Sequence, residues 1–171
     1  MATEIERKFL VKRKAFALFL ASSADTVTAL AVIQGYLHTT GVTTRVRLVD
    51  GVRGFLTIKG KRTSKFGRPE FEYPVPKEDA LALLAMCKDN VVSKTRYVLP
   101  VLGSNLIWEV DLFSGELEGL AMAEIELTTD EYPFVKPSWL GKEVSDDKRY
   151  TNKHLAVAKK IPKGKPGKPV N

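Results

Sequence analysis

Charged residues recur at every second position along much of this chain, and this alternation constrains its fold more than any other feature. In residues 3–11, TEIERKFLV, the side chains of Glu4, Glu6 and Lys8 occupy alternate positions. Successive side chains of a β-strand point to opposite faces of its sheet, so a strand here would place all three on one face. A solvated edge of a half-buried strand would explain this stretch alone. The rest of the chain decides whether that explanation is enough.

Eight stretches have a strand-like composition, and most follow one another through short connections, as antiparallel strands do. They are residues 4–11, 30–38, 43–49, 54–61, 68–75, 92–99, 105–113 and 117–128. Three further stretches, 14–21, 76–88 and 146–159, carry apolar stripes at helical spacing and would cover a sheet. The pattern predicts an α+β fold.

One face of these strands is charged, and the opposite face is largely apolar. The acids of the charged face are Glu4, Glu6, Glu70, Glu72, Glu109, Asp111, Glu124 and Glu126, and its bases are Lys8, Arg45, Arg47, Lys59, Lys61, Arg68, Lys94 and Arg96. An ordinary sheet would turn this face to water. Eight strands can also curl into a closed or nearly closed barrel, and helices packed outside on the apolar face would turn the charges inward. We therefore expect an eight-stranded antiparallel β-barrel that forms a charged tunnel, with amphipathic helices outside.

The length of 171 residues and the hydrophobic content of 44% fit one domain, predicted at residues 1–158. The net charge of +7 owes five charges to lysines in residues 159–171, which leaves 7 − 5 = +2 for the domain. We expect those 13 residues to be a disordered basic tail. The pI is therefore no reason to assign nucleic acid as a partner.

Other features narrow the class of protein. A single cysteine, Cys87, excludes an internal disulfide framework, and two histidines, His38 and His154, provide no zinc pattern. We expect both histidines to be structural or exposed. The acids near the start of the chain argue against a signal peptide, and the longest uncharged run, residues 26–44, is too polar to span a membrane. A cytoplasmic protein without a membrane partner is expected.

Acidic and basic side chains in one tunnel indicate a particular class of ligand. Carboxylates without histidine or thiolate select a hard cation, Mg²⁺ or Mn²⁺. Arginines and lysines bind phosphate oxygens. The expected ligand is therefore a metal-bound polyphosphate. A nucleotide-binding loop is not needed, and the spacing from Gly54 to Gly60, followed by Lys61 and Arg62, does not match one.

The hairpin around Asp50 and Gly51 tests this interpretation. A two-residue loop would place Lys59 on the opposite face from Arg45 and Arg47. The tunnel hypothesis therefore predicts an odd-length loop, for example residues 49–51 with Gly51 in a left-handed conformation, or a bulge.

Several short motifs, in order along the chain, resemble those of the CYTH family, also called triphosphate tunnel metalloenzymes. They are Glu4-x-Glu6-x-Lys8, Arg45-x-Arg47, Lys59 in TIKG, Arg68-x-Glu70-x-Glu72, Lys94-x-Arg96, Asp111 in WEVDLF and Glu124-x-Glu126. The match covers roughly residues 3–155. The resemblance implies an eight-stranded antiparallel tunnel that binds triphosphate compounds and acts with Mg²⁺ or Mn²⁺.

The resemblance also implies roles for individual residues. Metal ligands are expected at Glu4, Glu6, Glu124 and Glu126, with Asp111 as a further ligand or its support. The expected triphosphate clamp consists of Lys8, Arg45, Arg47, Lys59, Arg68, Lys94 and Arg96. Of these groups, Glu4, Glu6, Lys8, Arg45, Arg47 and Lys59 are expected to be catalytic. Supporting positions are expected at Glu70 and Glu72, which would orient bases or assist a second metal, at Glu109, and at Tyr150, in a stretch resembling the segment before a tunnel-closing C-terminal helix.

Three functions remain open at this point. The preferred one is metal-dependent hydrolysis of inorganic triphosphate, because the chain is short and has no appended domain. An adenylyl cyclase or a nucleoside or thiamine triphosphatase would need a pocket for its organic group, for which no residues stand out. A non-catalytic binder of polyphosphate or RNA ends would gain nothing from four acids. A small-molecule triphosphate is the expected partner, and a homodimer is left open. The exposed loop at residues 63–67, with Lys61, Arg62 and Lys65 around it, is expected to be solvated.

Overall fold

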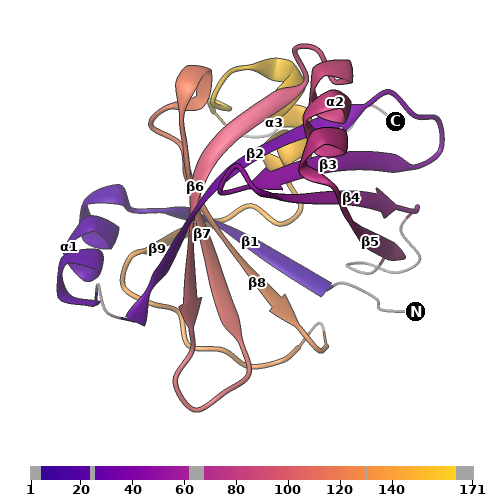
Figure 1. Ribbon diagram of the computed structural model, residues 1–171. Coiled ribbons are helices and arrows are strands. Elements are labelled where there is room, and N and C mark those ends of the chain that lie inside the picture. Colours follow the sequence, from indigo (N-terminus) through magenta and orange to yellow (C-terminus); the bar gives the residue numbers. More distant parts are fainter. Residues whose placement is uncertain (1–4, 24–25, 62–67, 130, 165–171) are drawn as a thin grey trace.

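The computed structural model describes residues 5–23, 26–61, 68–129 and 131–164. It contains nine strands and three α-helices (Figure 1). The strands are β1 (Ile5–Val11), β2 (Thr28–Leu37), β3 (Thr43–Val49), β4 (Arg53–Lys59), β5 (Glu70–Val75), β6 (Val91–Pro100), β7 (Ile107–Phe113), β8 (Ala121–Leu127) and β9 (Leu140–Glu143). The helices are α1 (Arg13–Ser23), α2 (Lys77–Met86) and α3 (Asn152–Ala158), with short 3₁₀ turns η2 (Gly115–Leu117) and η3 (Lys148–Tyr150). The α+β class is as expected.

The strands form one antiparallel sheet in the order β5-β4-β3-β2-β6-β7-β8-β1-β9. The expected closed barrel of eight strands is therefore corrected to an open sheet of nine. The extra strand, β9, pairs with β1 through Phe9 and Glu143 and takes the edge through which closure could have occurred. At Gly141, an added Cβ would lie 2.8 Å from the Leu10 carbonyl oxygen, so glycine permits this close approach.

The turn between β3 and β4 has three residues, because Val49 pairs with Arg53. Its first two residues, Asp50 and Gly51, have φ angles of 51° and 68°. The Asp50 carboxylate accepts a hydrogen bond from the Ala31 amide at 2.8 Å, which helps to hold this left-handed turn. The predicted odd-length loop is confirmed, although it covers residues 50–52, and it places Lys59 on the same face as the two arginines.

The apolar outer face of the sheet is covered at two places (Figure 1). Helix α1 inserts Phe16 among large side chains of β1, β6, β7 and β8, including Phe9 and Trp108. Helix α2 packs Ala80 on Val46 of β3. Burial of these side chains is the main stabilising contribution that the sequence pattern predicts.

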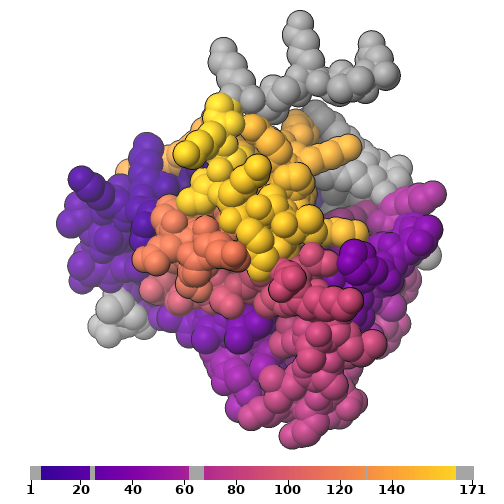
Figure 2. Space-filling model, turned by 90° about the horizontal axis from the view of Figure 1, so that it is seen from above, coloured from indigo at the N-terminus to yellow at the C-terminus, as the bar shows by residue number. Residues whose placement is uncertain are grey.

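Helix α3 lies on the other face, contrary to the expectation that all helices pack outside. Its Leu155 and Ala156 are fully buried and belong to a cluster with Tyr36, Phe113 and Met122, which share the inward side of their strands with the charged residues. The inward face thus changes along strands such as β7 and β8, which carry charged side chains at one end and Phe113 or Met122 at the other. The helix packs against the apolar end. Figure 2 shows the C-terminal segment, in yellow, at the surface on this side of the molecule.

The packed part of the chain extends past the predicted boundary at residue 158. Lys159 donates to the Val91 carbonyl at 2.9 Å, and Arg149 donates to the carbonyls of Lys163 and Gly164. Residues 159–164 therefore contact the domain, and residues 165–171 lie outside the described part. Among the described residues, no helix is long and apolar enough to cross a membrane.

Candidate functional site: a cavity with an acidic and a basic wall

Strands β1, β7 and β8 together form the first wall of a cavity. Their pairing places Glu6 opposite Glu126, and Glu124 opposite both Lys8 and Glu109. Directly opposite side chains on one face of a sheet are neighbours, so four carboxylates and one lysine share this part of the face. We call these five residues the acidic wall.

The Lys8 ammonium lies between two of these carboxylates. Its Nζ is 2.8 Å from Oε1 of Glu6 and 2.9 Å from Oε1 of Glu124. Burial alone would lower the pKa of Lys8, but Glu124 and Glu6 outweigh it and raise that pKa above its usual value. Burial would likewise raise the pKa of Glu124, whereas Lys8 and Arg96 lower it. A cation thus lies beside the Glu124 carboxylate, which is held ionised.

Strands β3, β4 and β5 form the opposite wall. The register places Arg45 beside Thr57 and Glu72, and Lys59 beside Glu70. Arg45 Nη2 lies 3.2 Å from Oε2 of Glu72, and Lys59 Nζ lies 2.6 Å from Oε2 of Glu70. We call Arg45, Arg47 and Lys59 with these two carboxylates the basic wall.

Arg47 is also bound to Glu72, with its Nη2 3.0 Å from Oε2. Its Nε is buried and has no hydrogen-bond partner among the described residues. Burial and the neighbouring Arg45 lower the pKa of Arg47 from its usual value. A buried guanidinium with a spare donor is suited to an additional anion.

Behind the acidic wall, β6 and β7 hold a buried charge cluster. The carboxylate of Asp111 lies 2.5 Å from Lys94 Nζ and 2.7 Å from Arg96 Nε. Arg96 also pairs with Glu109. Burial lowers the pKa of Lys94 to about 8 although Asp111 opposes the shift. Asp111 is 2% exposed, so this cluster is enclosed within the sheet.

The C-terminal segment covers one side of the site. The Thr151 hydroxyl accepts from the His154 amide and caps α3, which follows η3. From the first turn of this helix, the Asn152 side-chain oxygen accepts from Lys94 Nζ at 3.2 Å. The buried cluster is thereby connected to α3.

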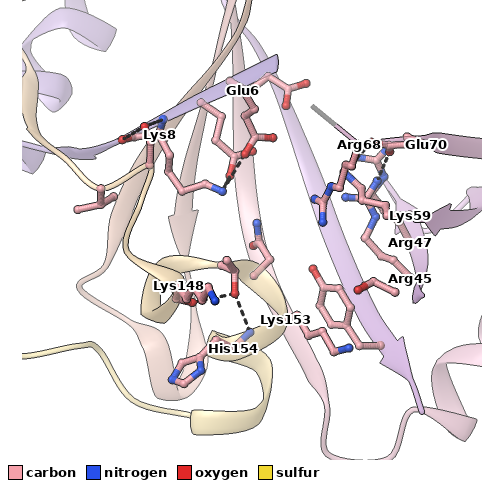
Figure 3. Close-up of a pocket in the computed structure, with 18 of the residues that line it drawn as sticks. Glu6, Lys8, Arg45, Arg47, Lys59, Arg68, Glu70, Lys148, Lys153 and His154 are labelled. Carbon is pink, nitrogen blue, oxygen red and sulfur yellow. Dashed lines mark hydrogen bonds and ion pairs between the residues drawn. The ribbon is translucent and has the colours of Figure 1, made fainter. Parts of the chain in front are cut away.

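A cavity of about 630 Å³ lies between the two walls. In Figure 3, Glu6 and Lys8 lie on one side and Arg45, Arg47, Lys59 and Arg68 on the other, with Lys148, Lys153 and His154 of the C-terminal segment nearby. A second space of about 440 Å³ shares Glu6, Glu109, Glu124 and Glu126 with the first. The carboxylates are thus reached from two sides.

The structure brings most of the predicted site residues to this cavity. Those that line it are Glu6, Lys8, Arg45, Arg47, Lys59, Arg68, Glu70, Glu72, Arg96, Glu109, Glu124 and Glu126. Lys94 and Asp111 lie behind the lining, and Tyr150 is buried beside α3, where its hydroxyl donates to the Pro162 carbonyl at 3.4 Å. Glu4, Arg62 and Lys65 lie outside the described residues, and Lys61 is exposed. The predicted roles of all these residues stay predictions.

Sequence reasoning missed other residues of the lining. Tyr36 is buried and lines the cavity, and its hydroxyl accepts a hydrogen bond from Gln34 Nε2 at 2.9 Å. Its position on the polar parity of β2 was a usable signal. Ser145, Lys148 and Lys153 also line the cavity, but they come from irregular or helical chain without strand periodicity, so no comparable signal existed.

The donor set of the acidic wall fits a hard divalent cation. Among the described residues, no group of three or more acidic, histidine or cysteine side chains stands close enough to enclose a metal ion. However, Lys8 already places a positive charge between Glu6 and Glu124. Carboxylate oxygens are the ligands that Mg²⁺ and Mn²⁺ prefer, so a divalent cation bound here would take the place of the Lys8 ammonium.

The antiparallel sheet thus carries an acidic and a basic wall that face each other across one cavity. The chain belongs to the CYTH domain family, whose model matches residues 2–160. The inorganic triphosphatase of Acetivibrio thermocellus is 38% identical over 157 residues, which cover 91% of this chain and 94% of that protein. The inorganic triphosphatase of Nitrosomonas europaea is 34% identical over 160 residues, covering 91% and 98% of the two chains.

Solved structures show the same fold. The crystal structure of the inorganic triphosphatase NE1496 matches with a TM-score of 0.62 and 32% identity, over 95% of this chain and 99% of that one. A conserved hypothetical protein from Pyrococcus furiosus matches with a TM-score of 0.56 over 75% and 80% of the two chains. At 21% identity, this second match speaks for the fold alone.

Proposed function

We propose that this protein hydrolyses inorganic triphosphate to pyrophosphate and orthophosphate, with Mg²⁺ or Mn²⁺ as cofactor. The observation that carries the proposal is that one cavity holds the cations of the basic wall and the carboxylates of the acidic wall, facing each other. Two relatives named inorganic triphosphatase, each similar over nine-tenths of the chain, support the choice of substrate.

The basic wall would bind the phosphates. Arg45 and Arg47 present planar guanidinium groups, and Lys59 adds an ammonium group from the adjacent strand. These cations would hold the chain of phosphates in one orientation and stabilise the charge that develops on the leaving pyrophosphate. Arg68 lies at the same side of the cavity and would extend this clamp.

The acidic wall would hold the cation through Glu6, Glu124 and Glu126, with Glu4 expected beside them. Such a cation supplies charge neutralisation on the phosphate oxygens and lowers the pKa of a bound water. In the reaction, a water oxygen forms a bond to the terminal phosphorus while the bond to the bridging oxygen breaks. The protons of the water end on the phosphate products.

Tyr36 would contribute a hydrogen bond to the substrate. Burial raises the pKa of Tyr36 to about 12, so its hydroxyl keeps its proton at neutral pH. Because the oxygen already accepts from Gln34, the proton of the hydroxyl is available to an acceptor in the cavity. A phosphate oxygen is such an acceptor.

Phosphate release tests the proposal. Inorganic triphosphate, ATP and thiamine triphosphate are each incubated with Mg²⁺, Mn²⁺ or a chelator, and cyclic nucleotide formation is measured alongside. We expect rapid, metal-dependent release from inorganic triphosphate and slow release from the other two compounds. Preference for ATP or formation of a cyclic nucleotide would contradict the choice of substrate.

Two variants test the site. Arg45→Ala and Glu124→Gln should each lower kcat/KM by about a thousandfold or more, because each removes a charge from the reacting centre. Matched controls are Arg53→Ala and Glu118→Gln, since Arg53 is an exposed arginine of β4 and Glu118 an exposed acid, both outside the cavity lining. Equal losses in variants and controls would contradict the assignment.

A further inference from the structure

The basic wall already holds an anion of its own. One carboxylate, that of Glu72, accepts from Arg45 Nη2 at 3.2 Å, from Arg47 Nη2 at 3.0 Å and from the Thr57 hydroxyl at 2.8 Å. All three reach the same oxygen, Oε2, and Arg47 Nη2 also lies 3.2 Å from Oε1. These contacts resemble those that a phosphate group would make. Glu72 therefore occupies the position in which the clamp would hold its ligand.

The charge of Glu72 is well maintained. Burial would raise its pKa, but Arg47, the Thr57 hydroxyl and Arg45 outweigh this effect and lower it. The carboxylate is thus ionised at neutral pH. A phosphate that reaches Arg45 and Arg47 must compete with a permanent negative charge attached to the protein.

Glu72 lies on a strand at one end of the sheet. This strand, β5, pairs with β4. The side chain of Glu72 is 33% exposed, compared with 2% for Asp111 in the cluster behind the acidic wall. On the outer side of β5, Phe71 and Tyr73 are exposed, so little packing holds the strand from behind.

We propose that Glu72 acts as an internal competitor for the phosphate-binding side chains, which weakens the binding of pyrophosphate and thereby promotes its release. This inference rests on the proposed function. After hydrolysis the product no longer spans the whole clamp, and the Glu72 carboxylate returns to Arg45 and Arg47 as pyrophosphate leaves. When triphosphate binds, its larger number of contacts offsets the free energy needed to displace Glu72 from the two arginines.

Calorimetric titration in the presence of a chelator tests the inference. Pyrophosphate and inorganic triphosphate are titrated separately into the full-length protein, into Glu72→Gln and into Glu118→Gln at one fixed salt concentration. Removing one charge-assisted competitor should tighten pyrophosphate binding to Glu72→Gln by about tenfold. The control makes the same chemical change on an exposed residue outside the cavity and should leave affinity unchanged.

A second readout uses the working enzyme. The inhibition constant of pyrophosphate against triphosphate hydrolysis should fall in Glu72→Gln by a similar factor and stay constant in Glu118→Gln. If Glu72 instead only positions the arginines, Glu72→Gln would bind pyrophosphate more weakly, and the inference would be wrong. Unchanged affinity, or equal tightening in both variants, would also overturn it.

The failure of the inference can be told apart from the failure of the proposed function. If the unaltered protein binds and hydrolyses triphosphate while Glu72→Gln does not bind pyrophosphate more tightly, only the role of Glu72 is refuted. If the unaltered protein binds neither triphosphate nor pyrophosphate, both the proposed function and this inference are refuted.

Discussion

The acidic wall and the basic wall both hold charged side chains partly away from water, but the protein behind them differs. The acidic wall is backed by large aromatic rings on the outer face of the sheet. There, Phe9 meets Trp108 with ring centroids 5.8 Å apart, and Phe16 meets Trp139 at 5.2 Å. Such contacts bury large areas and restrict movement.

The hydrophobic packing behind the basic wall involves smaller side chains. The cluster outside it contains Val46, Leu48, Ala80 and Cys87, and helix α2 approaches so closely that a Cβ on Gly54 would lie 2.7 Å from that of Ala80. On β5, at the end of the sheet, Phe71 is 45% exposed. This contrast fits the proposed function, in which the firmly packed acidic wall positions the cation and the more exposed basic wall binds and releases the phosphates.

The largest difference should appear when a carboxylate is neutralised in the buried cluster behind the acidic wall or in the basic wall. Asp111→Asn leaves Lys94 and Arg96 buried without a full counter-charge, and we expect the free energy of unfolding to fall by about 3–5 kcal/mol. Glu72→Gln removes a half-exposed partner and should cost no more than about 1 kcal/mol. Urea denaturation of both variants measures these losses. Equal losses would refute the contrast between the basic wall and the buried cluster that supports the acidic wall.

A smaller effect is expected where Glu72 is tethered. Thr57→Val keeps the shape of a fully buried side chain but removes the hydroxyl that donates to Glu72 at 2.8 Å and accepts from Arg45 Nη2 at 3.1 Å. We expect a loss of about 1–2 kcal/mol in the free energy of unfolding, the net contribution of two hydrogen bonds. Thermal unfolding monitored by circular dichroism measures it. A loss comparable to that of Asp111→Asn would show that the basic wall is as firmly built as the acidic side.

The smallest effect concerns pH. The pKa of Glu72 is lower in the folded protein than its usual 4.5. Its ionised form therefore contributes stability above about pH 4.5, and this contribution is lost as the pH falls through the folded-state pKa. The stability difference between the unaltered protein and Glu72→Gln should be constant near pH 7 and shrink below pH 4.5, by less than about 1 kcal/mol in total because the group is half exposed. Calorimetric unfolding of both proteins near pH 7 and below pH 4.5 checks the sign of this change in the stability difference. A difference that grows on acidification would contradict it.

Much of this site could be predicted because strand parity is a local property. The alternation around Glu6 and Lys8, and around Glu124 and Glu126, determines which face each side chain takes, and the three-residue turn at Asp50 keeps Lys59 in phase with Arg45. These predictions needed only the twofold period of a strand.

Features that depend on distant contacts could not be predicted in this way. Strand β9 forms because Glu143 pairs with Arg7 and the strand lies against β1, although its short sequence, LGKE, has no clear alternation. The inward position of α3 depends on Leu155 meeting Met122, residues far apart in the sequence. Likewise, the bond between Asn152 and Lys94 joins a helix to a strand that no local pattern connects.

A crystal structure with Mn²⁺ and a non-hydrolysable triphosphate analogue would test the division between the two walls most directly, since the anomalous signal of manganese locates the cation. We predict a manganese peak at Glu6, Glu124 and Glu126, with Lys8 displaced from between the carboxylates. The phosphates should lie on Arg45, Arg47 and Lys59, and Glu72 should have moved away from the guanidinium groups. A manganese peak at Glu70 and Glu72 alone, with Lys8 still bound to Glu6 and Glu124, would contradict the account.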